Sequence, residues 1–274
     1  MNDDWINWVD VQRTSRLQPP RAPSHEDGVM MLELARDLID VPRQVPVVVF
    51  GVTPEIIGLD WPGNVELLAV DANPAVVDAA WVPSEKDRSQ VIVSAWDSMP
   101  IEPGSIDLIV GDCSFNALPD EGQYAAVAGE CARVLRAGGQ AILRFFASSY
   151  PCKTPREAIV DAQACPDGRL SNFRLDLAMA ISGTHGFVTS REIKRVFDDL
   201  VPDRAAFAAR AGAAVAEVER VIYMPAARFP DMRLNYFTTE QIALLVAPGL
   251  TIDAVQYPSY LMGHACPTIR LARQ

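Results

Sequence analysis

The chain of 274 residues carries 24 Lys and Arg against 35 Asp and Glu, which gives a formal net charge of -11. A surface this acidic repels phosphate backbones and anionic lipid, so we expect neither a nucleic-acid substrate nor a membrane partner. No apolar run approaches the roughly 18 residues of a membrane span, and a hydrophobic content of 49% predicts a globular rather than a disordered chain.

Cysteine usage and the first residues bear on the cellular compartment. The five cysteines are odd in number and form no Cys-x-x-Cys pair, and residues 1–20 are polar, unlike a signal peptide. Both features favour a reduced cytoplasm. No grouping of His, Cys, Asp and Glu has the spacing of metal ligands, so we expect no metal. The oligomeric state stays open, a homodimer included.

The first half of the chain alternates between apolar strands and helical segments. Residues 1–23 are predicted to form an irregular, Pro-rich arm, and Ser24 begins an amphipathic helix. A helix over 121–139, closed by its glycines, precedes the last strand of this half. The alternation predicts an open parallel sheet wound on both faces. The expected strands are 45–51, 65–71, 89–97, 105–112 and 140–146.

The pattern changes to helical periodicity over residues 154–247. Capping signals at Thr154, Thr189 and Thr238 predict three helix starts, and residues 203–223 are the longest helical candidate. Two late strands are expected at 250–257 and 266–272.

The segment VVVFGVTPE (47–55) is the first candidate for chemistry, because a strand runs into a tight turn and a helix start. Backbone N–H groups at such a turn point into the crevice above the sheet and suit a nucleotide-like ligand. Gly51 allows ligand and backbone to approach closely. The alternative is an ordinary turn between a strand and a helix.

Asp71 ends the second strand, about 20 residues beyond Gly51. A carboxylate at that place accepts hydrogen bonds from both hydroxyls of a ribose. The alternative role is the N-cap of the helix in NPAVVDAA.

The next two strand ends also carry candidates. Trp96 and Asp97 follow the third strand, where an aromatic ring and a carboxylate bracket an adenine; the alternative is a packed Trp and a solvated turn Asp. Small and polar side chains lie at the carboxyl end of the fourth strand, where doubly wound sheets bind ligands. These are Asp112, Cys113, Ser114 and Asn116.

In these segments the chain resembles the class I S-adenosylmethionine-dependent methyltransferases, strongly over about residues 45–147 and more weakly over 250–272. Four motifs carry the resemblance in order: VVVFGVTPE, LLAVDANPAVV, SAWDSMPIEPGSIDLIVGDCSF and ECARVLRAGGQAILRFF. The resemblance implies a doubly wound, mostly parallel seven-stranded α/β sheet of Rossmann-like type. It divides the chain into an N-terminal arm and helix (1–40), the cofactor-binding core (41–150), a helical insert or lid that shapes the acceptor pocket (151–248) and the C-terminal strands (249–274).

The resemblance also implies S-adenosylmethionine as the cofactor, S-adenosylhomocysteine as its product and methyl transfer to a small-molecule acceptor. Asp71 would hold the ribose, Trp96 and Asp97 the adenine, and Asp112 would lie near the sulfonium or amino group. Further residues would face the cofactor, those of the first loop on its methionine side: Gly51, Val52, Thr53, Ala72, Asn73, Cys113 and Ser114.

One departure concerns the first loop, which in the family usually has three alternating glycines. Here the positions read Gly51, Thr53 and Glu55, so Thr53 and the helix start would hold the cofactor instead. A nicotinamide cofactor would require G-x-G-x-x-G after the first strand, and this pattern is absent.

Candidates for a catalytic base are few. Methyl transfer is an in-line displacement in which positioning supplies most of the catalysis, although an oxygen or carbon nucleophile also needs a base. The candidates are Asp112, Tyr150 and His185. Asp112 and Tyr150 would lie nearer the expected methyl position. The alternative for His185 is a structural histidine, and that for Asp112 is a loop cap. An amine would need only to arrive deprotonated.

Arginines are the candidates for binding an anionic acceptor. Arg144 at the end of the fifth strand is the preferred one, with Asn116 as a second substrate residue. The insert contributes Arg169, Arg174, Arg228 and Arg233, most of which we expect on solvated helix faces. Two other functions stay open: a non-catalytic partner subunit that binds the cofactor or nothing, and an enzyme that uses the cofactor for another transfer.

Overall fold

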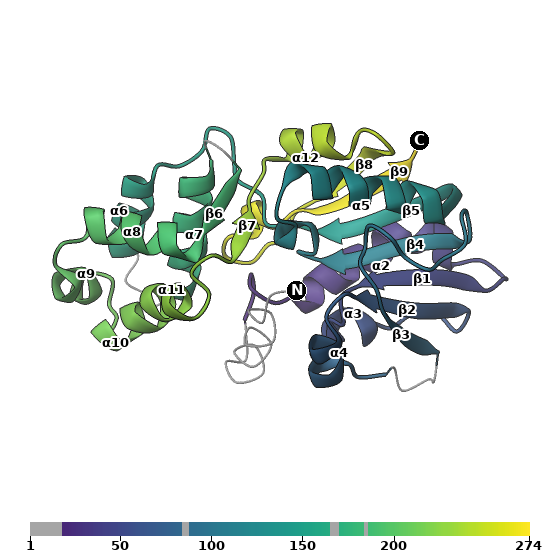
Figure 1. Cartoon of the computed structure of the whole chain (residues 1–274), viewed down its shortest axis with the longest axis horizontal. Helices are drawn as coiled ribbons and strands as arrows, with labels where there is room; N and C mark the ends of the chain where they lie inside the picture. The colour runs from purple at the N-terminus through teal and green to yellow at the C-terminus, as the bar shows by residue number, and fades with distance from the viewer. Residues whose placement is uncertain (1–17, 84–87, 165–169, 184–185) are drawn as a thin grey trace. The chain divides into compact units, whose positions relative to one another are not determined.

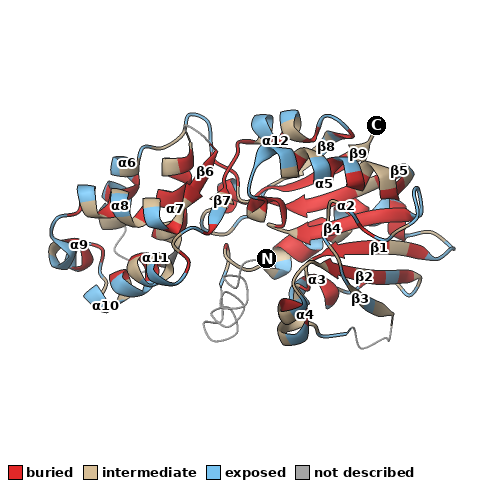
Figure 2. Ribbon diagram, viewed as in Figure 1, coloured by how far each residue is buried: buried red, intermediate tan, exposed pale blue. Residues whose placement is uncertain are grey.

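A computed structural model describes residues 18–83, 88–164, 170–183 and 186–274. It divides into two compact units: residues 1–146 with 241–274, and residues 147–240 (Figure 1). Figure 2 shows that buried residues gather on the strands of the first unit and on the inner faces of the helices in the second. The expected arm over residues 1–23 falls mostly outside the described residues.

The first unit contains a seven-stranded sheet in the order β3-β2-β1-β4-β5-β9-β8. The strands β1 to β5 pair in parallel, and β9 pairs antiparallel with both β5 and β8. This confirms the predicted doubly wound, mostly parallel seven-stranded sheet of Rossmann-like type. The strands are β1 Val45–Phe50, β2 Val65–Asp71, β3 Ser89–Val93, β4 Ile106–Asp112, β5 Leu135–Arg144, β8 Leu250–Gln256 and β9 Thr268–Arg273.

Helices cover both faces of this sheet. Side chains of α2, α3 and α4 share one core with the inward residues of β1, β2 and β4, while α5 contacts β5 and β8. Ser24 caps α2 reciprocally with Asp27, as the sequence at this helix start predicts. The helices are α2 His25–Ile39, α3 Pro54–Ile57, α4 Pro74–Ala80, α5 Glu121–Val134 and α12 Thr239–Val246, with single turns at Phe115–Ala117 and Gly263–Ala265.

The junction between α5 and β5 differs from the expectation. The helix ends at Val134, and the glycines lie inside β5 rather than closing the helix. Leu135 pairs with Ile106, and the register then shifts before Leu108 pairs with Gln140. Gly138 has φ +75°, and a Cβ on Gly139 would lie 3.1 Å from the carbonyl oxygen of Asp107. The glycines therefore form an irregularity within the strand pair.

The second unit consists of helices and one short strand pair. The expected helix starts at Thr154 and Thr189 are confirmed, the latter with a reciprocal capping box to Glu192. The longest helical candidate is broken near Gly212, which has φ +66°. The antiparallel strands β6 and β7 were not expected. The elements are α6 Pro155–Ala164, α7 Leu170–Ser182, β6 Phe187–Thr189, α8 Ser190–Leu200, α9 Arg204–Arg210, α10 Val215–Val218, the π-helical turn Glu219–Tyr223, α11 Met224–Arg228 and β7 Arg233–Asn235.

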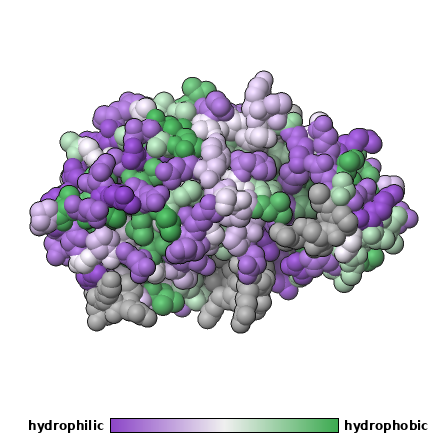
Figure 3. Space-filling view, turned by 180° about the vertical axis from the view of Figure 1, so that it is seen from behind, coloured by the Kyte–Doolittle hydropathy of each residue, from purple (hydrophilic) through white to green (hydrophobic). Residues whose placement is uncertain are grey.

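The surface is mixed in character. Figure 3 shows hydrophilic residues over most of the face that it presents, with hydrophobic residues in scattered groups. None of the helices in the described ranges combines the length and the apolar character that a membrane span requires.

Candidate functional site

The turn after β1 brings together residues that are distant in the sequence. Gly51 has φ +85°, a conformation that favours glycine, and its N–H donates to the carbonyl of Val70 at 2.8 Å. A Cβ on Gly51 would lie 3.8 Å from Thr53 Oγ1 and 3.9 Å from Asp71 Oδ2. Gly51 therefore lies within van der Waals reach of a hydroxyl and a carboxylate that come from two different strand ends. Thr53 occupies the N-cap position of α3 without bonding through its side chain.

Asp71 lies at the carboxyl end of β2, and one of its two carboxylate oxygens accepts a hydrogen bond within the protein. Its Oδ1 accepts from the N–H of Asn73 at 2.8 Å, whereas no hydrogen bond to Oδ2 occurs within the described ranges. The N-cap of α4 is Asn73, whose Oδ1 accepts from the Ala75 N–H at 3.0 Å, so the capping role considered for Asp71 belongs to Asn73. Burial raises the pKa of Asp71, and the hydrogen bond from Asn73 partly opposes this rise.

Two neighbours of these residues contribute in different ways. Val52 is buried in the core beneath the turn, so only its backbone is available to a ligand. Ala72 is half-buried between Asp71 and Asn73.

Trp96 is held firmly against the sheet. Its indole stacks on Phe50 with ring centroids 5.1 Å apart, and its N–H donates to the carbonyl of Val70 at 2.7 Å. The ring is therefore packed, as its alternative interpretation held, although it remains half-buried at the edge where β1 and β2 end. Asp97 is half-buried, and its Oδ1 accepts from the hydroxyl of Ser98.

An ion pair joins the ends of β4 and β5. Arg144 Nε donates to Asp112 Oδ1 at 2.6 Å, and the arginine side chain is completely buried. Arg144 Nη1 also donates to the carbonyl of Pro20 at 2.8 Å and to the hydroxyl of Tyr260 at 3.1 Å. The negative charge of Asp112 raises the pKa of Arg144 against the effect of burial. Two of the three guanidinium nitrogens of Arg144 thus bond to other groups of the protein.

The loop after β4 is tied to β5. Cys113 has φ +50° and donates its N–H to the carbonyl of Arg144. The Asn116 side chain donates to the carbonyl of Phe146 at 2.7 Å and accepts from its N–H at 2.9 Å. Burial raises the pKa of the Cys113 thiol, so it stays protonated. Ser114 Oγ is buried and has no partner among the described residues.

Two residues of this cluster were not predicted from the sequence. Tyr260, in the loop between β8 and β9, receives a bond from Arg144 and donates its own hydroxyl proton to Asp27 Oδ1 at 3.1 Å. Asp27 is fully buried although it belongs to the first turn of α2. Helix periodicity places Asp27 near a cap, but no local pattern indicates that Tyr260 returns to it across 233 positions of sequence.

Of the other two catalytic candidates, one belongs to the second unit and one lies outside the described residues. Tyr150 belongs to the second unit, where it is 87% exposed. His185 lies outside the described residues. Within the described ranges, no three His, Cys, Asp or Glu side chains are grouped as a metal site.

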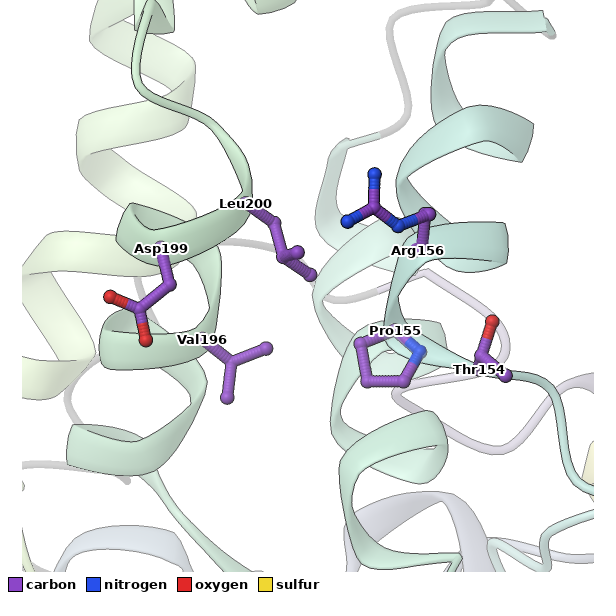
Figure 4. A pocket seen from close by; sticks show the side chains of 6 residues that line it. All are labelled: Thr154, Pro155, Arg156, Val196, Asp199 and Leu200. Atoms are coloured by element: carbon purple, nitrogen blue, oxygen red, sulfur yellow. The ribbon is translucent and has the colours of Figure 1, made fainter.

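The second unit has an open groove of about 310 Å³ that contains none of the predicted site residues. Figure 4 shows the beginning of α6 on one side and the end of α8 on the other. Its lining side chains are Thr154, Pro155, Arg156, Val196, Asp199 and Leu200.

Comparison with known proteins agrees with this geometry. Residues 57–143 match the family model of a methyltransferase domain, which spans β2 to β5 with their connecting helices. This part of the chain is a methyltransferase domain. The match covers the carboxyl ends of β2 and β4, and together with the fold it supports S-adenosylmethionine as the cofactor. A search of curated protein sequences gives no significant match.

Solved structures share the fold of the methyltransferase domain at low sequence identity. A methyltransferase from Methanosarcina mazei is 13% identical, with a TM-score of 0.52 and coverage of 88% of this chain and 96% of that one. The N-methyltransferase NodS from Bradyrhizobium japonicum, solved with S-adenosylhomocysteine, is 11% identical, with a TM-score of 0.50 and coverage of 99% of each chain. A Rhodobacter sphaeroides protein assigned as a Zn-dependent alcohol dehydrogenase is 11% identical, with a TM-score of 0.56 and coverage of 100% and 99%. At these identities the likeness establishes the fold alone.

Proposed function

We propose that the chain is an S-adenosylmethionine-dependent methyltransferase that transfers the methyl group in line to a small-molecule acceptor. The methyltransferase-domain match over residues 57–143 and the seven-stranded sheet support the reaction class. The net charge of -11 favours a small molecule over nucleic acid as the acceptor.

The observation that carries the proposal is the juxtaposition of Gly51 with Thr53 Oγ1 and Asp71 Oδ2 at the ends of β1 and β2. Asp71 Oδ2 has no hydrogen-bond partner among the described residues, whereas Oδ1 accepts from Asn73. A ribose placed there would donate its hydroxyl protons to that carboxylate. The packed Trp96 ring would offer its accessible edge to the base, and Asp97 would accept from the exocyclic amine. These contacts fit the cofactor that the domain match supports.

The bound cofactor would supply an electrophilic methyl group together with its leaving group. The protein would then contribute orientation and the exclusion of water. Asp112 is already engaged in the ion pair with Arg144. A neutral amine acceptor requires no protein base and fits this arrangement best. For an oxygen or carbon nucleophile, Asp112, Tyr150 and His185 remain the proposed bases.

Calorimetry tests the cofactor assignment. Wild-type protein should bind S-adenosylmethionine and S-adenosylhomocysteine with a Kd in the micromolar range or tighter, about -8 kcal/mol at 1 μM. Asp71→Ala should weaken binding by tenfold or more, since charge-assisted hydrogen bonds contribute about 1.5–3 kcal/mol each. Asp71→Asn should be milder because one acceptor oxygen remains. The exposed Asp78→Ala in α4 is the matched control and should bind normally.

Two other functions are tested by the same samples. Binding of NAD without binding of either S-adenosyl compound would contradict the proposal in favour of a nicotinamide enzyme. A chain that binds S-adenosylmethionine, but from which mass spectrometry detects no methylated product with any acceptor offered, would be a partner subunit instead.

A further inference from the structure

Arg144 pairs with Asp112 through one nitrogen only. Its Nε donates to Asp112 Oδ1 at 2.6 Å, and no hydrogen bond joins it to Oδ2 among the described residues. Pairs of arginine and carboxylate are frequently bidentate, with two nitrogens of one edge bonding to the two oxygens. On the edge that faces Asp112, Nη2 is buried and has no hydrogen-bond partner in the described structure. The guanidinium is therefore turned away from the arrangement that would engage both oxygens.

Two acceptors hold Nη1 of this guanidinium. It donates to the carbonyl of Pro20 at 2.8 Å and to the hydroxyl of Tyr260 at 3.1 Å. Tyr260 has one hydroxyl proton, which it donates to Asp27 Oδ1 at 3.1 Å, so its oxygen is left to accept from Arg144. Asp27 is itself fully buried and accepts from Ser24 at the start of α2. The orientation of Arg144 is thus fixed from α2 through the tyrosine.

This chain of bonds ends at a carboxylate that solvent reaches. The side chain of Asp112 is 13% exposed, whereas that of Arg144 is completely buried. The thiol of Cys113 also bonds to the carboxylate, but an S–H group is a weak donor. A cationic N–H donor makes a shorter and stronger bond to a carboxylate and would displace the thiol. Asp112 therefore retains the capacity to bind a cationic group at the carboxyl end of β4.

Loss of the Tyr260 hydroxyl would change how Arg144 is paired. Nη1 would keep only the carbonyl of Pro20, and Nη2 would still have no partner in the described structure. Unused donors in the interior are costly, so the guanidinium would gain by bonding to the second oxygen of Asp112. That rotation would withdraw the second oxygen from any ligand.

We propose that Tyr260 is a positioning residue that keeps one oxygen of Asp112 available to the ammonium group of the cofactor. The inference rests on the proposed methyltransferase function, with Asp112 near the amino group of S-adenosylmethionine. Tyr260 does not itself contact the cofactor but acts through Arg144. Arg144 in turn serves Asp112 rather than an anionic acceptor. All of these residues belong to the first unit.

A matched pair of ligands tests this role in the full-length chain. S-adenosylhomocysteine has the ammonium group, and its deamino analogue lacks only that group and keeps the adenosine, the thioether and the carboxylate. In Tyr260→Phe, the calorimetric Kd for S-adenosylhomocysteine should rise about fivefold or more, and that for the deamino analogue should change by less than about twofold. Tyr257→Phe is the matched control, because Tyr257 lies in the same loop and is 52% exposed. It should bind both ligands as the wild type does.

The outcomes separate this inference from the proposed function. An equal loss of affinity for both ligands in Tyr260→Phe would overturn the inference, because a general disturbance of the fold does not distinguish the ammonium group. Unchanged affinity for both would also overturn it and would leave the methyltransferase assignment intact. A wild-type protein that binds neither ligand would contradict the proposed function, and the inference with it.

A second variant serves if Tyr260→Phe does not fold. Arg144→Lys keeps the positive charge but lacks the planar group that bonds to several acceptors at once. It should show the same selective loss of affinity for S-adenosylhomocysteine. The selectivity of the wild type in Arg144→Lys would overturn the inference.

Discussion

Single residues at the crevice show where sequence reasoning succeeds and where it stops. Spacing and strand ends predicted that Gly51 and Asp71 lie together, and in the structure a Cβ on Gly51 would lie 3.9 Å from Asp71 Oδ2. Spacing could not show that Asn73 rather than Asp71 caps α4, because both residue types cap helices equally well. Nor could it show that Arg144 is engaged within the protein, since that depends on its contacts with Asp112, Pro20 and Tyr260.

The raised pKa of Asp71 predicts how cofactor binding depends on pH. Burial disfavours the carboxylate in the free protein, whereas ribose hydroxyls would stabilise it. Cofactor affinity should therefore be greatest above the pKa of Asp71 and should fall as the pH drops through that pKa. The pKa of Asp71 lies above the ordinary carboxyl value of about 3.9. Calorimetric titrations between neutral and mildly acidic pH would measure this trend. A trend of equal steepness in Asp71→Asn would show that another group is responsible.

The same raised pKa of Asp71 has the opposite effect on the stability of the fold. Because the pKa of Asp71 is higher in the folded state than in the unfolded state, its ionised form costs stability at neutral pH, and this cost disappears as pH falls through the folded-state pKa. Asp71→Asn should thus raise the free energy of unfolding at pH 7 even as it weakens cofactor binding. Urea unfolding without ligand would measure the effect, and a destabilised Asp71→Asn protein would contradict it.

The ion pair between Arg144 and Asp112 predicts strong non-additivity. Asp112→Ala leaves a fully buried guanidinium with no carboxylate and should destabilise the fold by about 3–5 kcal/mol. The double variant Asp112→Leu with Arg144→Met should lose less than the sum of the single changes. A double-mutant cycle from urea unfolding checks this, and additive losses would show that the two groups act independently.

At the scale of elements, periodicity predicted the central strands almost completely. Their runs are apolar because both faces are covered by helices. The errors have local causes. Residues 135–139 continued a helical pattern, yet pairing of Leu135 with Ile106 makes them part of β5. The strands β6 and β7 are three residues each, which is too short for alternation to indicate them.

Gly111 tests the packing of β4 between its neighbours. A Cβ there would lie 2.8 Å from Ser114 Oγ and 3.1 Å from both Phe50 Cβ and Leu143 Cδ2. Gly111→Ala should therefore destabilise the first unit by about 1–3 kcal/mol. Gly129→Ala is the contrasting control, because its exposed helical site in α5 has no atom within 4 Å, and it should stabilise by about 0.5–1 kcal/mol. Thermal unfolding of both variants would decide, and a harmless Gly111→Ala would refute the close packing.

At the scale of the whole molecule, the cofactor should act on the first unit. Gly51 and Asp71 belong to that unit. S-adenosylhomocysteine at 100 times its Kd should stabilise the first unit by about 2.7 kcal/mol. Hydrogen exchange resolved by peptide would show which segments the ligand protects from opening. Protection of residues 147–240 alone by S-adenosylhomocysteine would contradict the placement of the cofactor at β1 and β2.

The order of strands in the sheet has a consequence for synthesis on the ribosome. The strand β5 pairs with β9, where Gln140 lies opposite Ala272, and the whole of residues 147–240 is made between them. A nascent chain that has completed β1 to β5 must therefore hold an open strand edge until β9, residues 268–273, emerges. Such edges invite pairing with other chains, and domains begin to fold as they emerge. Correct folding thus depends on β9 pairing with β5 before a strand of another chain does.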